Sequence, residues 1–406
     1  MRCKIMRKAI VFSYIMPIFS LMLLFNLEIK AQESSKTIPS NLKWSERMAF
    51  SIIERHPQAW QIDNHETPKW DYKIGMILTA YEKLYTKTGN QQYLNYIKAY
   101  ADTLINDSGA FQNFNPQDHN IDFINAGKIL FGLYDKTKEQ KYLIALRTLR
   151  NQFIDYPRTP SGGFWHKKIY PNQMWLDGLY MGQPFYARFN AEFEKGDKLN
   201  DVAHQFELLH DHTLDRKTGL FFHAYDESKQ MAWANKETGT APHIWLRALG
   251  WYGMALVDAL DYFPNNHPKR KELIHYLNEL TIAVTQYQDA SGLWYQIPNM
   301  PTSEGNYLEA SGSSMLIYAI AKGVHKGYLP IEFEKVALKG FDGLITKLIR
   351  VDNNGEVHIT QVCKSAGLGG NPYRDGSYKY YMSEKVMTDN SHGLGAFLLA
   401  AIELDK

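Results

Sequence analysis

Gln173-Met-Trp-Leu-Asp-Gly-Leu-Tyr-Met-Gly-Gln-Pro-Phe185 is the stretch from which both the fold and a functional site can be predicted. It is apolar almost throughout, yet it carries Asp177, a carboxylate that is costly to bury unless it is hydrogen-bonded or paired. Trp175 offers an aromatic face for stacking, and Gly178 lets another group approach the backbone closely. We interpret the stretch as the start of a buried helix with a carbohydrate site at its N-terminal end.

Similar helical segments recur along the chain and predict a ring of helices. Segments rich in Gly, Ala, Leu and Tyr start near residues 71, 125, 176, 246, 310 and 391. More amphipathic segments start near residues 91, 139, 197, 269 and 331, and one at about 42–55 opens the chain. Small residues allow close helix approach, so the first set is expected inside and the second outside. We therefore predict an all-α (α/α)6 barrel of six inner and six outer helices, closed by pairing of the last helix with the first, in one domain over residues 32–406.

A second repeat places short strands at one end of this barrel. Glycine followed by aromatic or apolar residues occurs after several outer helices, in Ser108-Gly-Ala-Phe111, Ser161-Gly-Gly-Phe164, Thr218-Gly-Leu-Phe221 and Ser291-Gly-Leu-Trp294. Each predicts a turn and a short extended piece that leads to the next inner helix. The other end has tight polar turns such as TKTGNQQ at 86–92. Function is therefore expected at the end with loops and short aromatic strands.

Composition narrows the class of protein. The 406 residues carry a net charge of +2, which gives no case for nucleic-acid binding. Aromatic residues make up 14%, as a packed helical core or a sugar-binding surface would require. The sequence contains no HExxH, cysteine cluster, GxGxxG after a strand, P-loop or GxSxG, so we expect neither a metal nor a cofactor.

The N-terminus has the pattern of a secretory signal peptide over residues 1–31. Basic residues within 2–8 precede an apolar run at 9–27, and Ala31 offers a small residue before Gln32. An uncleaved anchor is the alternative, because the apolar run is long. Removal of the signal takes Cys3 with it and leaves Cys363 without a disulfide partner. We expect an exported, periplasmic protein with no other membrane contact.

Polar and aromatic residues gather at the predicted starts of the inner helices. They are Trp70, Asp71, His119, Asn120, Asp122, Trp175, Asp177, His243, Trp245, Arg247, Trp251, Glu309, Ser311, Asp389, Asn390 and His392, and the short strands add His166, Lys167, His223 and Trp294. Helix capping accounts for acids at such positions, above all Asp71 and Asp389. Arg247 needs an anionic partner, either a protein or a substrate carboxylate. The set favours carboxylate acid–base chemistry on an anionic sugar.

The sequence resembles a known family in several blocks. GGFWHKKIYPN at 162–172 and QMWLDGLYMGQPF at 173–185 resemble glycoside hydrolase family 105, the unsaturated rhamnogalacturonyl hydrolases. IDFINAGKILFGLYDKT at 121–137, GLFFHAYDE at 219–227 and WLRALGWYGMALVDALDYFP at 245–264 resemble further blocks, and the similarity runs from about residue 42 to the C-terminus. That family has the (α/α)6 barrel fold. Family 88, the unsaturated glucuronyl hydrolases, is related and shares fold and mechanism.

The resemblance implies removal of a 4,5-unsaturated uronic acid, galacturonyl rather than glucuronyl, from lyase-generated oligosaccharides such as rhamnogalacturonan fragments. A proton goes to C4, water adds at C5, and the hemiketal opens to release the aglycone. Asp177 is the implied general acid and base, with Asp122 as the second carboxylate. The implied substrate contacts are Trp175, His223, Arg247, Trp251, Lys167 and His166. The only binding partner that we expect is the unsaturated oligosaccharide substrate. We expect the protein itself to be a monomer or a weak homo-oligomer.

Some expectations from the residues remain open at this point. A proton donor near neutral pH needs a pKa above about 3.9, and apolar walls and an anionic Asp122 are expected to raise the pKa of Asp177. An inverting glycosidase of saturated sugars would instead pair Asp71 or Glu309 with Asp177. A polysaccharide lyase or a secreted sugar-binding protein are further alternatives. The Gly-rich loop 364–374 is interpreted as a flexible surface loop.

Overall fold

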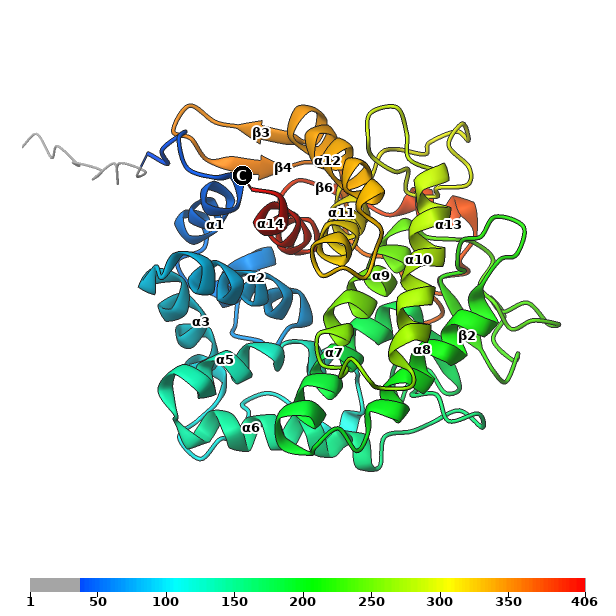
Figure 1. Ribbon diagram of the computed structural model, residues 1–406, viewed down its shortest axis with the longest axis horizontal. Helices are drawn as coiled ribbons and strands as arrows, with labels where there is room; N and C mark the ends of the chain where they lie inside the picture. The colour runs from blue at the N-terminus through cyan, green and yellow to red at the C-terminus, as the bar shows by residue number, and fades with distance from the viewer. Residues whose placement is uncertain (1–36, 406) are drawn as a thin grey trace, which may run out of the picture. The chain divides into compact units, whose positions relative to one another are not determined.

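The inner helical segments follow one another around a ring in chain order (Figure 1). They are α2 (Tyr72–Thr88), α4 with α5 (Asp122–Asn125 and Lys128–Thr137), α7 (Leu176–Phe193), α9 (Leu246–Leu260), α11 (Ala310–His325) and α14 (Ser391–Leu404). Each contacts the next, and α14 packs against α2 to close the ring. Small residues make this approach possible: a Cβ on Gly75 would lie 2.3 Å from the Cα of Ala126. The computed structural model describes residues 37–405, so the predicted signal peptide lies outside the described residues.

Each inner segment carries an outer helix. These are α1 (Trp44–Arg55), α3 (Gln91–Leu104), α6 (Gln140–Asn151), α8 (Leu199–Thr213), α10 (Arg270–Gln286) and α12 (Glu334–Gly343). Helix α1 packs on α14, and the backbone N–H of Ser45 donates to Asp405 Oδ2 at 2.9 Å. The other outer helices pack on the inner segment that precedes them. The predicted (α/α)6 barrel, including the pairing of the first helix with the last, is therefore confirmed.

Burial separates the two helix layers, as the sequence pattern predicts. All residues of α9 are buried, even Arg247 and Asp258, whereas the outer helices keep one face in solvent. None of the helices in residues 37–405 combines the length and apolar character that a membrane span requires.

The predicted glycine turns are present, with one more of the same kind. Gly109, Gly162, Gly219 and Gly292 all have positive φ, which favours glycine. A further turn at Gly355 was not predicted and joins β3 (Ile349–Val351) to β4 (Val357–Ile359). The remaining short elements are β1 (Gln173–Trp175), β2 (Ala224–Asp226), β5 (Val362–Cys363), β6 (Val386–Met387), α13 (Tyr378–Ser383), 3-10 turns at Ala59–Asn64, Pro116–Asp118, Gln152–Ile154 and Ile331–Phe333, and a π-helical turn at Leu344–Leu348.

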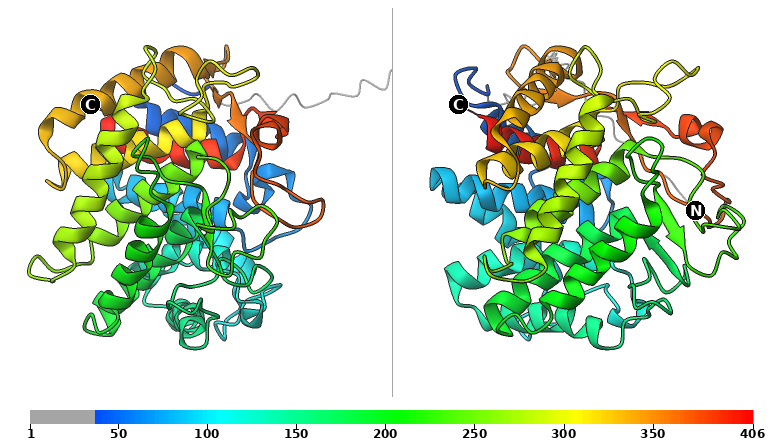
Figure 2. Two further views of the ribbon diagram at one scale, coloured as in Figure 1. Left: turned by 90° about the vertical axis from the view of Figure 1, so that its right-hand side faces the viewer. Right: turned by 45° about the vertical axis from the view of Figure 1, so that its right-hand side comes forward.

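Loops and short strands gather at the end of the barrel where the inner helices begin. Figure 2 shows them, with red-orange α13, on the right of the right-hand view. Strand β1 ends directly before α7 and pairs antiparallel with β2, so that Trp175 lies opposite Ala224. This pairing brings the start of α7 next to a segment that lies between α8 and α9 in the sequence.

Candidate active site

A cavity of about 120 Å³ lies at the loop-rich end of the barrel, and we call it the Asp177 cavity. Five of the predicted site residues line it, namely Asp122, His166, Lys167, Trp175 and Asp177. The other lining residues are Tyr72, Tyr170, Met181, Ser365, Ala366 and Arg374. The structure therefore brings together five of the eight residues that the resemblance implies, and the complete wall comes from four separate parts of the chain.

The β1–β2 pairing sets Asp177 against His223. Leu176 donates its backbone N–H to the carbonyl of His223 at 3.1 Å, directly beyond the Trp175–Ala224 pair. His223 Nε2 then lies 3.2 Å from Asp177 Oδ2, and His223 is fully buried. Its other ring nitrogen, Nδ1, lies 2.8 Å from the hydroxyl of Tyr381. Tyr381 thereby fixes the imidazole, and the imidazole fixes the carboxylate.

The pKa of Asp177 is lowered in the free enzyme, although apolar walls and Asp122 were expected to raise it; the expectation of a partly protonated Asp177 concerns the substrate complex. Burial alone would raise this pKa, but the attraction of the nearby His223 imidazole outweighs burial, with a smaller contribution from His166. Asp177 is therefore a carboxylate near neutral pH in the unliganded structure.

Asp122 is neutralised by a cation of its own. Lys167 Nζ lies 2.6 Å from Asp122 Oδ2, and His166 Nε2 lies 3.5 Å from Oδ1. Burial lowers the pKa of His166 to about 4, so the imidazole is neutral at neutral pH. Burial also disfavours the charge on Lys167, but Asp122 outweighs it and raises the pKa of Lys167. With Lys167 beside it, Asp122 exerts little net repulsion on Asp177.

Gly178 and Trp175 hold His166 in place. A Cβ on Gly178 would lie 3.0 Å from His166 Nδ1, so the group that approaches the backbone here is this imidazole. The Trp175 ring stacks on His166, with centroids 4.4 Å apart, and on Tyr170 at 5.2 Å. Trp175 is 5% exposed, so in this structure its stacking partners are protein rings.

Comparisons with known proteins place the whole barrel in a family. The model of Glycosyl Hydrolase Family 88 matches residues 44–406. The chain belongs to this family. It is also similar to a solved glycoside hydrolase from family 105 of C. acetobutylicum ATCC 824, with 44% identity and a TM-score of 0.86 over 89% of this chain and 99% of that one. The chain is therefore a glycoside hydrolase, and the resemblance to families 105 and 88 is confirmed.

Two further relatives are named for their activity. The unsaturated rhamnogalacturonyl hydrolase YesR of Bacillus subtilis (strain 168) is 27% identical over 288 residues, which cover 69% of this chain and 78% of YesR. An unsaturated glucuronyl hydrolase from Bacillus sp. GL1 is 13% identical with a TM-score of 0.62, over 84% of this chain and 88% of that one. The second likeness shows the fold alone.

Three predicted substrate contacts of this family 88 enzyme do not line the Asp177 cavity, namely His223, Arg247 and Trp251. His223 is fully buried against Asp177, which separates it from direct contact with a ligand in the cavity. Arg247 is 1% exposed; its Nη2 lies 3.6 Å from Glu309 Oε1, and its Nε donates to Ser311 Oγ at 2.8 Å. Its anionic partner is thus a protein carboxylate. Trp251 is also 1% exposed and stacks on Tyr180 with centroids 4.9 Å apart. This arrangement does not support direct contact of either side chain with substrate.

Asp71 and Glu309, the acids that an inverting glycosidase would pair with Asp177, have structural roles instead. Asp71 caps α2 by accepting the backbone N–H of Lys73 at 2.8 Å, as predicted for a cap. Glu309 is fully buried and accepts from Gly312 at 2.7 Å. The predicted cap Asp389 does not cap α14, because Asn390 takes that position. Neither Asp71 nor Glu309 lines the Asp177 cavity, which leaves Asp122 as the second carboxylate there.

Arg374 is a site residue that the sequence prediction missed. It belongs to the Gly-rich loop 364–374, which was interpreted as a flexible surface loop but contributes Ser365, Ala366 and Arg374 to the cavity wall. Its Nη2 donates to the Tyr170 hydroxyl at 2.9 Å and its Nε to the carbonyl of Gly369 at 2.8 Å. A Cβ on Gly367 would lie 2.3 Å from Arg374 Nη1, so glycine makes room for the guanidinium. An arginine inside a Gly-rich loop just before an inner helix was the available signal.

A group of potential metal ligands lies elsewhere in the described residues. Asp352, Glu356 and His358 on the β3–β4 hairpin have ligand atoms within 4.8 Å of one another. His358 Nδ1 already lies 2.5 Å from Asp389 Oδ2. None of these residues lines the Asp177 cavity, so the group has no part in the chemistry there.

Proposed function

We propose that this glycoside hydrolase removes a 4,5-unsaturated uronic acid, galacturonyl rather than glucuronyl, from the non-reducing end of lyase-generated oligosaccharides such as rhamnogalacturonan fragments. The observation that carries the proposal is Asp177, held against His223 in a cavity that also contains Lys167 and Arg374. A carboxylate for proton transfer thus faces cations suited to an anionic sugar. The family and the similarity to the unsaturated rhamnogalacturonyl hydrolase YesR support the same substrate class.

Asp177 serves first as acid and then as base in this scheme. It donates a proton to C4 of the double bond while water adds at C5, and its carboxylate then accepts the proton that the water loses. The resulting hemiketal opens and releases the aglycone. Since Asp177 is ionised in the free enzyme, it has to take up a proton as the substrate binds. The substrate carboxylate favours that uptake, because a nearby negative charge raises the pKa of a carboxyl group.

Arg374 is the side chain best suited to bind the substrate carboxylate. Lys167 is already paired with Asp122, whereas Arg374 donates to the Tyr170 hydroxyl and to backbone carbonyls. Its positive charge is therefore not neutralised by a carboxylate of the described chain. A planar guanidinium also matches a carboxylate with two parallel hydrogen bonds. Arg374 thus takes the role that the sequence had suggested for Arg247.

The decisive experiment follows the ultraviolet absorbance of the double bond. Mature enzyme is mixed with lyase digests that end in unsaturated galacturonyl or glucuronyl residues. Loss of absorbance, faster on the galacturonyl substrate, supports the proposal, and its abolition in Asp177→Asn assigns the acid. Asp135→Asn is the matched control, because Asp135 is an exposed acid outside the cavity. Steady absorbance on both substrates, with turnover of saturated oligosaccharides, would overturn it.

We also propose that residues 1–31 direct export to the periplasm. A mature N-terminus at Gln32 in the periplasmic fraction supports this proposal, and a full-length protein in the cytoplasmic fraction contradicts it. Light scattering on the same preparation tests the expectation of a monomer or weak homo-oligomer.

A further inference from the structure

A second cavity lies at the end of the barrel opposite the Asp177 cavity. It has a volume of about 270 Å³, and we call it the floor cavity. Its walls come from α2, α5, α7, α9 and α11, mostly from the second halves of these inner helices. It shares no lining residue with the Asp177 cavity. No step of the proposed reaction uses it.

Cations outnumber acids on the walls of the floor cavity. Five basic residues line it, namely Lys83, Lys87, Lys128, Arg188 and Lys322, against the three acids Glu82, Asp258 and Asp261. Lys322 takes both aspartates, since its Nζ lies 2.6 Å from Asp258 Oδ1 and 2.7 Å from Asp261 Oδ2. Arg188 lies 3.7 Å from Glu82 and 2.8 Å from Glu192. The acids of the cavity are therefore already engaged by two of its five cations.

Three lysines remain without a carboxylate partner in the described part of the chain. Lys87 donates to the carbonyl of Ile402 at 2.7 Å. Lys83 makes no hydrogen bond to another described residue, and its Nζ lies 5.9 Å from the centroid of the Tyr318 ring. Lys128 is 6% exposed; its buried Nζ has no hydrogen-bond partner and lies 3.5 Å from the centroid of Tyr180. Two ammonium groups in one cavity thus have aromatic faces near them but no acceptor.

Such an arrangement is unfavourable unless an anion completes it. A buried ammonium without a hydrogen-bonded counter-charge is costly, and neighbouring like charges add to the cost. Burial lowers the pKa of Lys128 to about 7, and burial and then Lys322 lower the pKa of Lys83. Asp258 attracts both lysines through space, but this attraction does not offset burial. An oxyanion between these lysines would supply both the missing acceptors and the missing charge.

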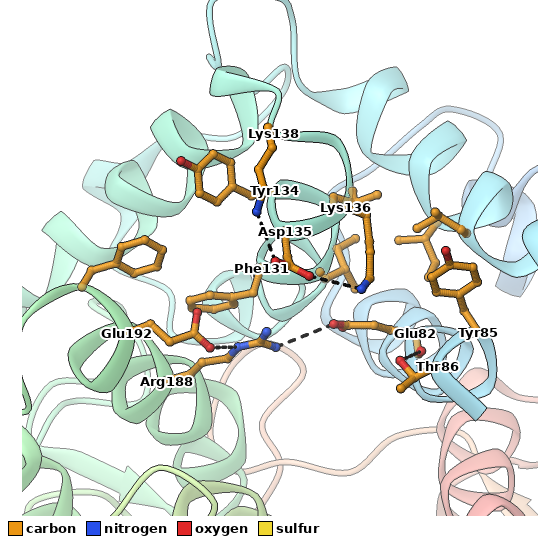
Figure 3. Close-up of a pocket in the computed structure, with 16 residues that line it drawn as sticks. Glu82, Tyr85, Thr86, Phe131, Tyr134, Asp135, Lys136, Lys138, Arg188 and Glu192 are labelled. Carbon is orange, nitrogen blue, oxygen red and sulfur yellow. Dashed lines mark hydrogen bonds and ion pairs between the residues drawn. The ribbon is translucent and has the colours of Figure 1, made fainter. Parts of the chain in front are cut away.

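A larger neighbouring cavity leads toward this position. It has a volume of about 410 Å³ and shares Glu82, Thr86 and Arg188 with the floor cavity. Figure 3 shows Arg188 extended between Glu192 and Glu82, so this ion-paired side chain lies where the two cavities meet. Aromatic side chains such as Phe131 and Tyr134 form part of the outer wall. A ligand that carries a ring next to its anionic group would thus have room beside Arg188.

We propose that the floor cavity is a binding site for a small oxyanion, held by Lys83, Lys87 and Lys128. The shared chemistry is a phosphate or carboxylate group. It is supplied either by a free inorganic anion or by an acidic monosaccharide.

The test measures binding of inorganic phosphate to the whole enzyme by calorimetry and by the shift of the melting temperature, at constant ionic strength set with sodium chloride. We expect saturable binding of about one phosphate per chain. Lys83→Met and Lys128→Met should each weaken it at least about tenfold. Lys269→Met is the control, because Lys269 is paired with Glu272 outside both cavities. Phosphate binding that is equal in wild type and both lysine variants, or no saturable binding at all, would overturn the proposal.

Two further measurements distinguish anion binding in the floor cavity from binding in the Asp177 cavity, and they identify the source of the anion. Arg374→Ala should leave phosphate affinity within about twofold, and loss of binding in this variant would move the site to the Asp177 cavity and overturn the proposal. Galacturonate is then titrated in place of phosphate. Tighter galacturonate binding that depends on Lys83 points to an acidic sugar, and tighter phosphate binding with the same dependence points to a free anion. Lys83 is only partly buried, so Lys83→Met keeps the test valid if Lys128→Met fails to fold.

Discussion

The two ends of the barrel differ in what their charges are free to do. Each end contains cations without a carboxylate partner in the described chain, Arg374 at one end and Lys83 and Lys128 at the other. The Asp177 cavity adds a carboxylate whose nearest partner is a histidine, whereas the aspartates of the floor cavity are tied to Lys322. The comparison teaches that binding an anion and transforming it are separate properties. Unpaired cations are enough to bind an anion, whereas catalysis also needs a carboxyl group that is not paired with a lysine or an arginine.

The largest effect is expected from replacing Asp177. Asp177→Asn keeps the shape of the side chain but removes the transferable proton, so kcat/KM on the unsaturated substrate should fall about 10³-fold. Lys128→Met at the other end should leave it within about twofold. Initial rates of absorbance loss measure both. Equal losses in the two variants would break the distinction between the ends.

Removal of the unpaired cation at the active end is expected to weaken substrate binding. Arg374→Ala should raise KM about 10–100-fold with little change in kcat, because a hydrogen bond to a charged group contributes about 1.5–3 kcal/mol. Arg374→Lys should give an intermediate KM, since it keeps the charge but loses the planar fork. Steady-state kinetics decide the matter. An unchanged KM in Arg374→Ala would assign the substrate carboxylate to another group.

Replacement of the buried lysine at the floor should change how stability depends on pH. The pKa of Lys128 is about 7 in the folded chain and about 10.4 in the unfolded chain, so the unfolded chain binds more protons between these values. The free energy of unfolding of the wild type should therefore increase as pH rises from 7 to 10, because of Lys128. Lys128→Met should lack that gain and be more stable at pH 7 by about 1–2 kcal/mol, after allowance for the lost contact with Tyr180.

Denaturant unfolding at several pH values checks this prediction. Lys269→Met should keep the wild-type slope, since the Lys269 side chain is 34% exposed and ion-paired at the surface. Parallel slopes in wild type and Lys128→Met would show that Lys128 keeps its charge in the folded chain up to high pH.

The smallest effect concerns the pH profile of activity. His223 lowers the pKa of Asp177 against burial, so its removal should let burial raise that pKa. In His223→Gln the limb of the kcat/KM profile that reports Asp177 should move to higher pH by about one unit, or about 1.4 kcal/mol. Tyr381→Phe keeps the imidazole and should move the limb less. If the limb does not move in His223→Gln, it does not report the titration of Asp177.

The helical repeat could be predicted from the sequence, but the charge pairs between distant segments could not. The inner helices and Asp177 were predictable because small residues and an acid with apolar flanks are local signals. The pKa of Asp177 was not predictable, because it depends on His223, which only the β1–β2 pairing brings near. The partner of Arg247 likewise depends on how α9 packs against α11.

The floor cavity had no sequence signal at all. Lys83 and Lys128 each lie within an ordinary helical pattern, and polar turns at that end gave no reason to expect a site. Arg374 is an intermediate case, since its Gly-rich loop was visible but its fold onto the cavity was not. The role of such residues depends on which side chains of other helices lie beside them in the folded barrel. A sequence pattern within one segment does not contain that information.

The contact of α1 with α14 has a consequence for the order of folding. Ser45 and Asp405, which join these helices, are separated by 360 positions in the chain. During synthesis α1 is made long before α14, so until α14 follows, α1 can make only its smaller contact with the inner helix α2. Ring closure is therefore a late event, and products that stop short of α14 expose the apolar side of α1 to chaperones and proteases. For the same reason, a circular permutant with its ends joined and new ends at the exposed turn around Gly89 should reach the same barrel by closing it elsewhere.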